Sequence, residues 1–308
     1  MQRFVLLLVT LLAVMHSFAG AQNEALDWQV YYSEKYNIFY HRSDSLNAIN
    51  TINIIDAEYA SISAELGADV TAPIGIFIAP SLYRFRVLTG GMLPHWGEAV
   101  ADPSRQIIIL KSPRWSKSTS DYRTVVIHEL VHVLVGAATD GAPVPRWLGE
   151  GLSIYFSGEI SYFGGSELFH AQVSDQIIPL AQIDEVLDFE KQKAHLAYQE
   201  SYLAVIYLLE AYGQSALPSL LSALRQTRDI NHALRQAFGI NMLQFETDWR
   251  QFLLERYRWS FLLEFDKYLW LLILVLFFLA LFAVMLRRRR TLARWEKEDV
   301  PPSPPSEI

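Results

Sequence analysis

The 308-residue chain contains no cysteine, and this absence excludes two kinds of chemistry. Without thiols, no disulfide can staple the fold and no metal can be bound through sulfur. Any metal in this protein must therefore be held by histidine and carboxylate side chains. Hydrophobic residues make up 51% of the chain, which is enough to bury the core of one large domain or two modest ones and excludes a disordered protein.

Clusters of basic residues are also missing from the main part of the chain. Residues 22–267 contain 19 Lys and Arg but 29 Asp and Glu, so this part of the chain is acidic. Binding to a nucleic acid requires a positive surface that neutralises phosphates. The composition therefore predicts that the protein has no nucleic-acid partner.

The N-terminus has the pattern of an export signal. Arg3 precedes an apolar run over residues 4–15, and the small residues at positions 19–21 match the sequence that signal peptidase accepts. We predict a cleaved signal peptide over residues 1–21, rather than an uncleaved anchor, and hence an exported protein.

A second hydrophobic run, residues 268–286, is long enough to cross a membrane. It holds 19 residues without a charge, and a helix of that length spans roughly 28 Å. The run is apolar on every side, with Tyr268 and Trp270 at its start and Arg287–Arg290 after its end. These features favour a transmembrane helix over a buried core helix.

The arginines after this run predict the topology, because positive residues that flank a span stay in the cytoplasm. Residues 22–267 then lie outside the cytoplasm, while the basic, proline-rich tail 287–308 lies inside and is expected to be disordered. Residues 258–267 form an amphipathic juxtamembrane linker that either lies along the interface or continues the helix. An exported protein with no cysteine and a single C-terminal anchor is typical of a bacterial plasma (inner) membrane.

Between the two hydrophobic ends, residues 22–257 are expected to form an α+β domain with two lobes. In the first lobe, residues 22–120, short β-rich runs alternate with a helical pattern at residues 46–66, which predicts a small mixed sheet with a packed helix. The predicted strands are residues 38–42, 74–80 and 106–110. In the second lobe, residues 121–257, helical periodicity dominates. Three glycines mark expected helix ends: Gly136, Gly213 and Gly239.

The segment VVIHELVHVLVG, residues 125–136, places three polar groups within an apolar run. On a helix, His128 and His132 lie on one face, one turn apart, which lets two imidazole nitrogens converge on one zinc ion. Glu129 is angled away from the ligands but can reach a water in an open coordination position, as a general base must. The alternatives are a chance match to the HExxH pattern, and two core histidines satisfied by hydrogen bonds.

A third metal ligand is expected at Glu150. It stands near the start of a second helical segment, PVPRWLGEGLSIYFSG (residues 143–158), with 17 residues between it and His132. The segment is amphipathic, so a helix packed antiparallel to the first could bring Glu150 under the histidines. The alternative is a solvated carboxylate favoured by the helix macrodipole. Two histidines, a glutamate and an open fourth position form the geometry of a catalytic zinc.

The pairing of HELVH, residues 128–132, with WLGEGLSIYF, residues 147–156, resembles the gluzincin zinc metallopeptidases. This group includes thermolysin and the aminopeptidase N family, and the chain is similar particularly to its small peptidase MA-like members. The resemblance covers residues 28–257 and implies a thermolysin-like zincin fold, in which the HExxH helix precedes a mostly helical lobe.

The resemblance also implies roles for individual residues. It implies one Zn²⁺ ion per chain, held by His128, His132 and Glu150, and Glu129 as the general base. Tyr198, in the segment AYQESYLAVIYLLEAYG, is similar in position to the tyrosine that stabilises the tetrahedral oxyanion in aminopeptidases. From the residues alone, Tyr198 could instead be a packing aromatic. His195, one turn earlier, is the substitute candidate.

Two departures from the family pattern affect what can be carried over. The stretch PHWGEAVADPSRQIIIL, residues 94–110, looks like the edge strand over the active-site helix, but Gly97–Ala101 lack the aminopeptidase signature that captures a free α-amine. Exopeptidase specificity is therefore not implied. Thermolysin-like members also place an aspartate four residues after the glutamate ligand, where this chain has Ile154. The group that orients a ligand histidine must come from elsewhere, with Ser153 as a candidate.

These features predict a membrane-anchored, extracytoplasmic zinc metallopeptidase. The short linker to the membrane gives it little reach, so we expect polypeptide substrates close to the lipid surface. The competing function is a catalytically silent binding or scaffold module that keeps the same fold at the membrane. A scaffold does not need the base Glu129 together with all three ligands, so the enzyme is favoured.

Overall fold

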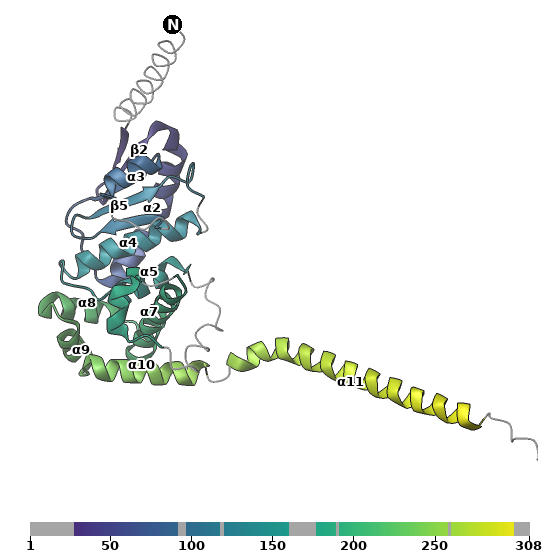
Figure 1. Cartoon of the computed structure of the whole chain (residues 1–308). Helices are drawn as coiled ribbons and strands as arrows, with labels where there is room; N and C mark the ends of the chain where they lie inside the picture. The colour runs from purple at the N-terminus through teal and green to yellow at the C-terminus, as the bar shows by residue number, and fades with distance from the viewer. Residues whose placement is uncertain are drawn as a thin grey trace, which may run out of the picture. The chain divides into compact units, whose positions relative to one another are not determined.

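The computed structural model (Figure 1) describes six stretches of the chain: residues 28–91, 97–117, 120–159, 177–188, 191–257 and 260–298. The predicted signal peptide, residues 1–21, lies outside them. The chain divides into two compact units, with the boundary between Glu255 and Arg256. The first unit contains the sheet and most of the helices, and the second contains the long C-terminal helix.

Five strands form one mixed sheet in the order β1-β2-β3-β5-β4. They are β1 (Trp28–Tyr32), β2 (Tyr36–His41), β3 (Ile74–Ala79), β4 (Ala99–Asp102) and β5 (Ile107–Lys111). Strands β2, β3 and β5 run parallel, whereas β1 and β4 pair antiparallel at the two edges. The small mixed sheet is therefore confirmed, and β2, β3 and β5 lie within two residues of the predicted strands.

Helices lie against both faces of this sheet (Figure 1). They are α2 (Ser45–Leu66), preceded by the short helix η2 (Arg42–Asp44), α3 (Leu82–Leu88) and α4 (Tyr122–Ala138). Side chains alternate along β3, and Ile78 is fully buried on one face of the sheet. Helix α2 contacts β2, and α4 contacts β4 and β5. On the other face, Phe85 of α3 packs with Ala79 and Ile109. The helix predicted at residues 46–66 is confirmed as α2, whereas α3 was not predicted.

The edge strand β4 leads into a turn that packs on α4. A Cβ atom added at Gly136 would lie 2.5 Å from the Cβ atom of Pro103 in this turn, which is closer than side-chain atoms can approach. Gly136 thus lies within α4, where it allows the close approach of Pro103. The prediction that a helix ends at Gly136 is wrong. The helix continues to Ala138.

After the sheet and its helices, the described residues of the first unit form mainly helices, as predicted for the second lobe. They are α5 (Arg146–Ser157), η4 (Leu180–Asp188), α7 (Lys191–Tyr212), α8 (Ala216–Thr227), α9 (Ile230–Phe238) and α10 (Met242–Tyr257). Gly213 follows α7 and Gly239 follows α9, both with positive φ, so these two predicted helix ends are confirmed. Trp147 of α5 stacks on Phe245 of α10 with the ring centroids 5.4 Å apart, and both side chains are fully buried. This aromatic pair joins the two helices in one core.

The second unit contains helix α11 (Ser260–Glu298). Its stretch Leu269–Thr291 is long and apolar enough to cross a membrane, and none of that stretch is buried inside the protein. The predicted span, residues 268–286, lies within α11. The juxtamembrane residues from Ser260 onward continue the same helix, which is one of the two arrangements expected for them.

The tail that was expected to be disordered is helical as far as Glu298. Its first proline is Pro301, and the residues before it are mostly arginine, leucine, alanine, glutamate and lysine, which favour helix. Helix α11 therefore extends beyond the four arginines. Residues 299–308 lie outside the described part of the chain.

Helices α5 and α7 pack closely because α5 has a glycine where they touch. A Cβ atom at Gly151 would lie 2.3 Å from the carbonyl oxygen of Ser201 and 2.8 Å from a methyl carbon of Val205. A second glycine of α5, Gly149, is different, since a Cβ atom there would lie 3.7 Å from Nδ1 of His132, an ordinary van der Waals distance. Only Gly151 is therefore required by the packing of the two helices.

We expect Gly151→Ala to lower the free energy of unfolding by about 2 kcal/mol or more, because the added methyl group forces α5 and α7 apart. Gly149→Ala, the matched control on the same helix, should leave stability unchanged or raise it by up to about 1 kcal/mol through helix propensity. Urea unfolding of the chelator-treated protein in detergent, followed by circular dichroism, measures both. Equal stability of the two variants would contradict the close approach at Gly151.

Candidate metal centre

Helix α4 carries three polar side chains among residues that are mostly apolar and buried. Asp121 caps its N-terminus by accepting a hydrogen bond from the N–H of Thr124 at 3.4 Å. The apolar residues around the motif are buried: Val126, Ile127, Leu130, Val131 and Val133. His128, Glu129 and His132 lie instead on the partly exposed side of the helix. The periodicity of α4 thus separates the core from a polar face.

Helix α5 brings Glu150 to this face. The N-terminus of α5 has no capping side chain at Pro145, and Asp184 of η4 takes that role by accepting a hydrogen bond from the N–H of Arg146 at 2.8 Å. A second segment thus fixes the start of α5. Glu150 itself is only 8% exposed, so its carboxylate needs partners inside the protein.

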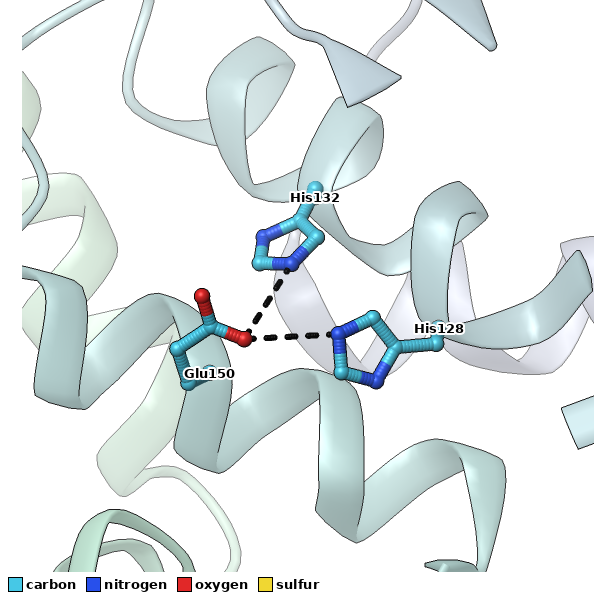
Figure 2. Close-up of side chains that lie close together, drawn as sticks. All are labelled: His128, His132 and Glu150. Carbon is cyan, nitrogen blue, oxygen red and sulfur yellow. Dashed lines mark ion pairs between the residues drawn. The ribbon is translucent and has the colours of Figure 1, made fainter. Parts of the chain in front are cut away.

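Those partners are the two histidines of α4. One carboxylate oxygen of Glu150, Oε2, lies 3.3 Å from Nε2 of His128 and 3.6 Å from Nε2 of His132 (Figure 2). Ligand atoms of the three residues all lie within 4.8 Å of one another. The two imidazole rings are tilted by 69°, with centroids 5.0 Å apart, so they approach the carboxylate from different directions. The structure thus brings together the three residues that the sequence singled out as metal ligands.

The donor set suits zinc. Tetrahedral zinc with bonds of about 2.0–2.2 Å to nitrogen and oxygen holds its ligand atoms about 3.4 Å apart. The two distances from the carboxylate oxygen of Glu150 to the histidine nitrogens are 3.3 and 3.6 Å. The cluster could therefore hold a zinc ion without a large rearrangement.

The other oxygen of Glu150 has a different partner. Oε1 lies 3.6 Å from Nη1 of Arg146, one helical turn earlier on α5. One carboxylate oxygen therefore faces the histidines while the second faces a guanidinium group. This arrangement orients Glu150 so that it presents a single oxygen to the cluster.

The second ring nitrogen of His128, Nδ1, also has a carboxylate partner. This atom lies 3.3 Å from Oε2 of Glu159, which follows the end of α5. The sequence pattern had left Ser153 as a candidate for such a contact. In the described part of the chain, the buried Oγ of Ser153 has no hydrogen-bond partner, so it does not orient a histidine there.

The charges of the cluster shift its pKa values strongly. Burial lowers the pKa of His128, but hydrogen bonds with Glu150 and Glu159 outweigh this effect and raise it to about 10. Burial raises the pKa of Glu150, but hydrogen bonds with His128 and His132 prevail and hold it well below its usual range. These two shifts favour an ion pair between His128 and Glu150 in the metal-free protein. A metal ion that binds His128 must displace its proton, so metal binding is expected to weaken as the pH falls.

Glu129 stands between this cluster and the sheet. Its carboxylate has a backbone hydrogen bond with Ala101 of the edge strand β4. Burial raises the pKa of Glu129, although the neighbouring charges of His128 and His132 oppose the shift. A carboxyl group whose pKa is raised toward neutrality is suited to accept and return a proton.

Tyr198 approaches the site from α7. Burial raises its pKa above the usual range, and the negative charges of Glu150, Glu159 and Glu129 add to the shift. The side chain therefore lies within the electrostatic field of the cluster. His195, the other candidate, lies one turn earlier on α7 and is partly buried.

Comparison with known proteins identifies one family. The model of the peptidase MA superfamily matches residues 56–255, which include α4, α5 and α7. No curated protein matches the chain.

We expect alanine at any one of the three cluster residues to weaken zinc binding by at least about 100-fold, because a three-ligand site loses one of its donors. The variants are His128→Ala, His132→Ala and Glu150→Ala. Metal analysis after dialysis against a mild chelator should find about one zinc per chain in the unmodified protein and far less in each variant. His232→Ala, at an exposed histidine paired with Asp229, is the control and should keep its zinc. Full zinc retention in all three variants would show that the ligands are misassigned.

Proposed function

Because the chain belongs to the peptidase MA superfamily, we propose that it is a zinc metallopeptidase that hydrolyses peptide bonds. The observation that carries this proposal is the convergence of His128, His132 and Glu150, with Glu129 beside them. These four residues come from two helices and lie within the matched part of the chain.

The residues have distinct roles in this proposal. His128, His132 and Glu150 hold the zinc ion, which when bound supplies the Lewis acidity that makes water a nucleophile at neutral pH. Glu129 takes the proton from the attacking water and passes it to the leaving amine as the peptide bond breaks. Its raised pKa favours the first of these transfers, because it makes the carboxylate a stronger base.

Tyr198 is proposed to donate a hydrogen bond to the negative charge that develops on the carbonyl oxygen when water attacks the carbonyl carbon. Its pKa is raised by burial and by the nearby carboxylates, so the phenol keeps its proton and remains a donor. The charges of Glu150 and Glu129 act on Tyr198, which supports this role, and His195 stays the substitute candidate.

An extended polypeptide is the substrate that the surroundings of Glu129 suit best. Strand β4 pairs with β5 on one side, and within the described residues it is the last strand of the sheet. An edge strand can form backbone hydrogen bonds with an extended chain. Glu129 lies beside this strand at Ala101, so a peptide along β4 would pass the catalytic base. A scaffold module would not require this combination of base and ligands.

We further propose that α11 anchors the enzyme in a membrane, with the active site outside the cytoplasm. The apolar stretch Leu269–Thr291 supports the anchor, and Arg287–Arg290 at its end support a cytoplasmic C-terminus. The signal-like residues 1–21 agree with this direction. A bacterial plasma (inner) membrane fits these features, and substrates close to the lipid surface follow from the short connection between α10 and α11.

Glu129→Gln should abolish catalysis without removing the metal. We expect turnover of an unstructured peptide to fall by several orders of magnitude while about one zinc per chain remains bound, because the amide cannot accept the proton from water. Tyr198→Phe should lower turnover about 100-fold through the loss of one oxyanion donor. Peptide cleavage by Glu129→Gln at the unmodified rate would rule out this mechanism.

The proposed topology predicts where a fused reporter is active. A reporter enzyme that works only outside the cytoplasm should be active when fused after Tyr257 and silent when fused after Ile308, since α11 then separates the two positions. Enzyme assays on whole cells with equal fusion levels measure this. Activity of both fusions, or of the second alone, would show that the anchor is misassigned.

A further inference from the structure

His128 is contacted by a carboxylate at each of its two ring nitrogens. Nε2 lies 3.3 Å from Glu150, and Nδ1 lies 3.3 Å from Oε2 of Glu159. The first contact belongs to the three-residue cluster, whereas the second comes from outside it. The side chain of Glu159 is 28% exposed and that of His128 is 19% exposed, so the contact is partly shielded from water.

A left-handed turn at the end of α5 places Glu159 there. The helix ends at Ser157, and Gly158 adopts a φ of 72° while its N–H donates to the carbonyl of Ile154 at 3.1 Å. Among the described residues, no atom beyond the chain neighbours lies within 4 Å of a Cβ atom built at Gly158, so this position favours glycine for its conformation. The turn brings Glu159 back alongside α4.

We propose that Glu159 is a positioning residue that holds the ring of His128 for the metal. This inference rests on the proposed zinc site and adds the residue that prepares one of its ligands. A carboxylate on Nδ1 keeps the proton on that nitrogen, which leaves Nε2 free to bind the metal. Its negative charge also makes the imidazole a stronger donor.

The surroundings of His128 support this assignment. Ile154, four residues after Glu150, is apolar and cannot accept a hydrogen bond from a ring nitrogen. The side-chain oxygen of Ser153 makes no hydrogen bond within the described residues. Glu159 is the carboxylate with an ion pair to Nδ1, and it approaches from the side of the ring opposite the cluster.

The test measures zinc affinity of the full-length protein in detergent, by competition with a chromophoric chelator. We expect Glu159→Ala to weaken binding about 10- to 100-fold and Glu159→Gln about 10-fold, because the amide keeps a hydrogen-bond acceptor but loses the charge. Glu58→Gln is the matched control. Glu58 pairs with Arg123 of α4 and has a side-chain exposure of 29%, close to that of Glu159, but it lies outside the cluster. Its zinc affinity should stay within twofold of the unmodified protein.

Two further readouts separate positioning from a general structural role. The chelator-treated Glu159→Gln protein should keep the far-ultraviolet circular dichroism spectrum of the unmodified protein, while the visible absorption spectrum of its cobalt-substituted form should shift. Affinities of both Glu159 variants within twofold of the unmodified protein, with an unchanged cobalt spectrum, would overturn the proposal. Where Glu159→Ala does not fold, Glu159→Gln decides by the same thresholds. An unmodified protein that binds no zinc would instead refute the proposed function.

Discussion

The arrangement of the site depends on the burial of one carboxylate. Glu150 is 8% exposed, and an ionised group at that depth is costly unless other charges or hydrogen bonds surround it. His128 and His132 contact one of its oxygens, and Arg146 contacts the other. Helices α4 and α5 must therefore meet where these partners converge. The contacts of Glu150 thus act together with apolar packing to set the relative position of the two helices.

The residues beside Glu150 extend this constraint to the rest of the domain. Gly151 lets the backbone of α7 approach α5 at Ser201, whereas a Cβ atom at Gly149 would lie at an ordinary van der Waals distance from the ring of His132. Tyr198 lies one turn before Ser201 on α7, so the close packing of α5 and α7 also places Tyr198 near the carboxylates of the site. On the far side of α4, strand β4 reaches Glu129. Helices α4, α5 and α7 and strand β4 thus place polar groups around one site. Helix α5 packs against both α4 and α7.

Periodicity explains which parts could be predicted from the sequence. The two histidines of HELVH share a helix face by their spacing alone, Glu150 stands in an amphipathic segment, and alternating apolar runs revealed three of the five strands. Glu159 follows a left-handed turn and belongs to no periodic face, so no pattern pointed to it. A glycine such as Gly136 can mark a helix end or a close contact, and only its tertiary neighbour Pro103 distinguishes the two. Contacts between distant segments are not encoded in local patterns.

The central claim is that this cluster binds zinc in order to cleave polypeptides. The most direct measurement follows the cleavage of a library of unstructured peptides by the full-length protein in detergent, using mass spectrometry. Samples are compared as purified, after removal of metal with a chelator, and after addition of one equivalent of zinc. The account predicts that cleavage disappears with the chelator and returns with zinc. Cleavage that persists in the chelator-treated protein, or no cleavage with zinc stoichiometrically bound, would contradict it.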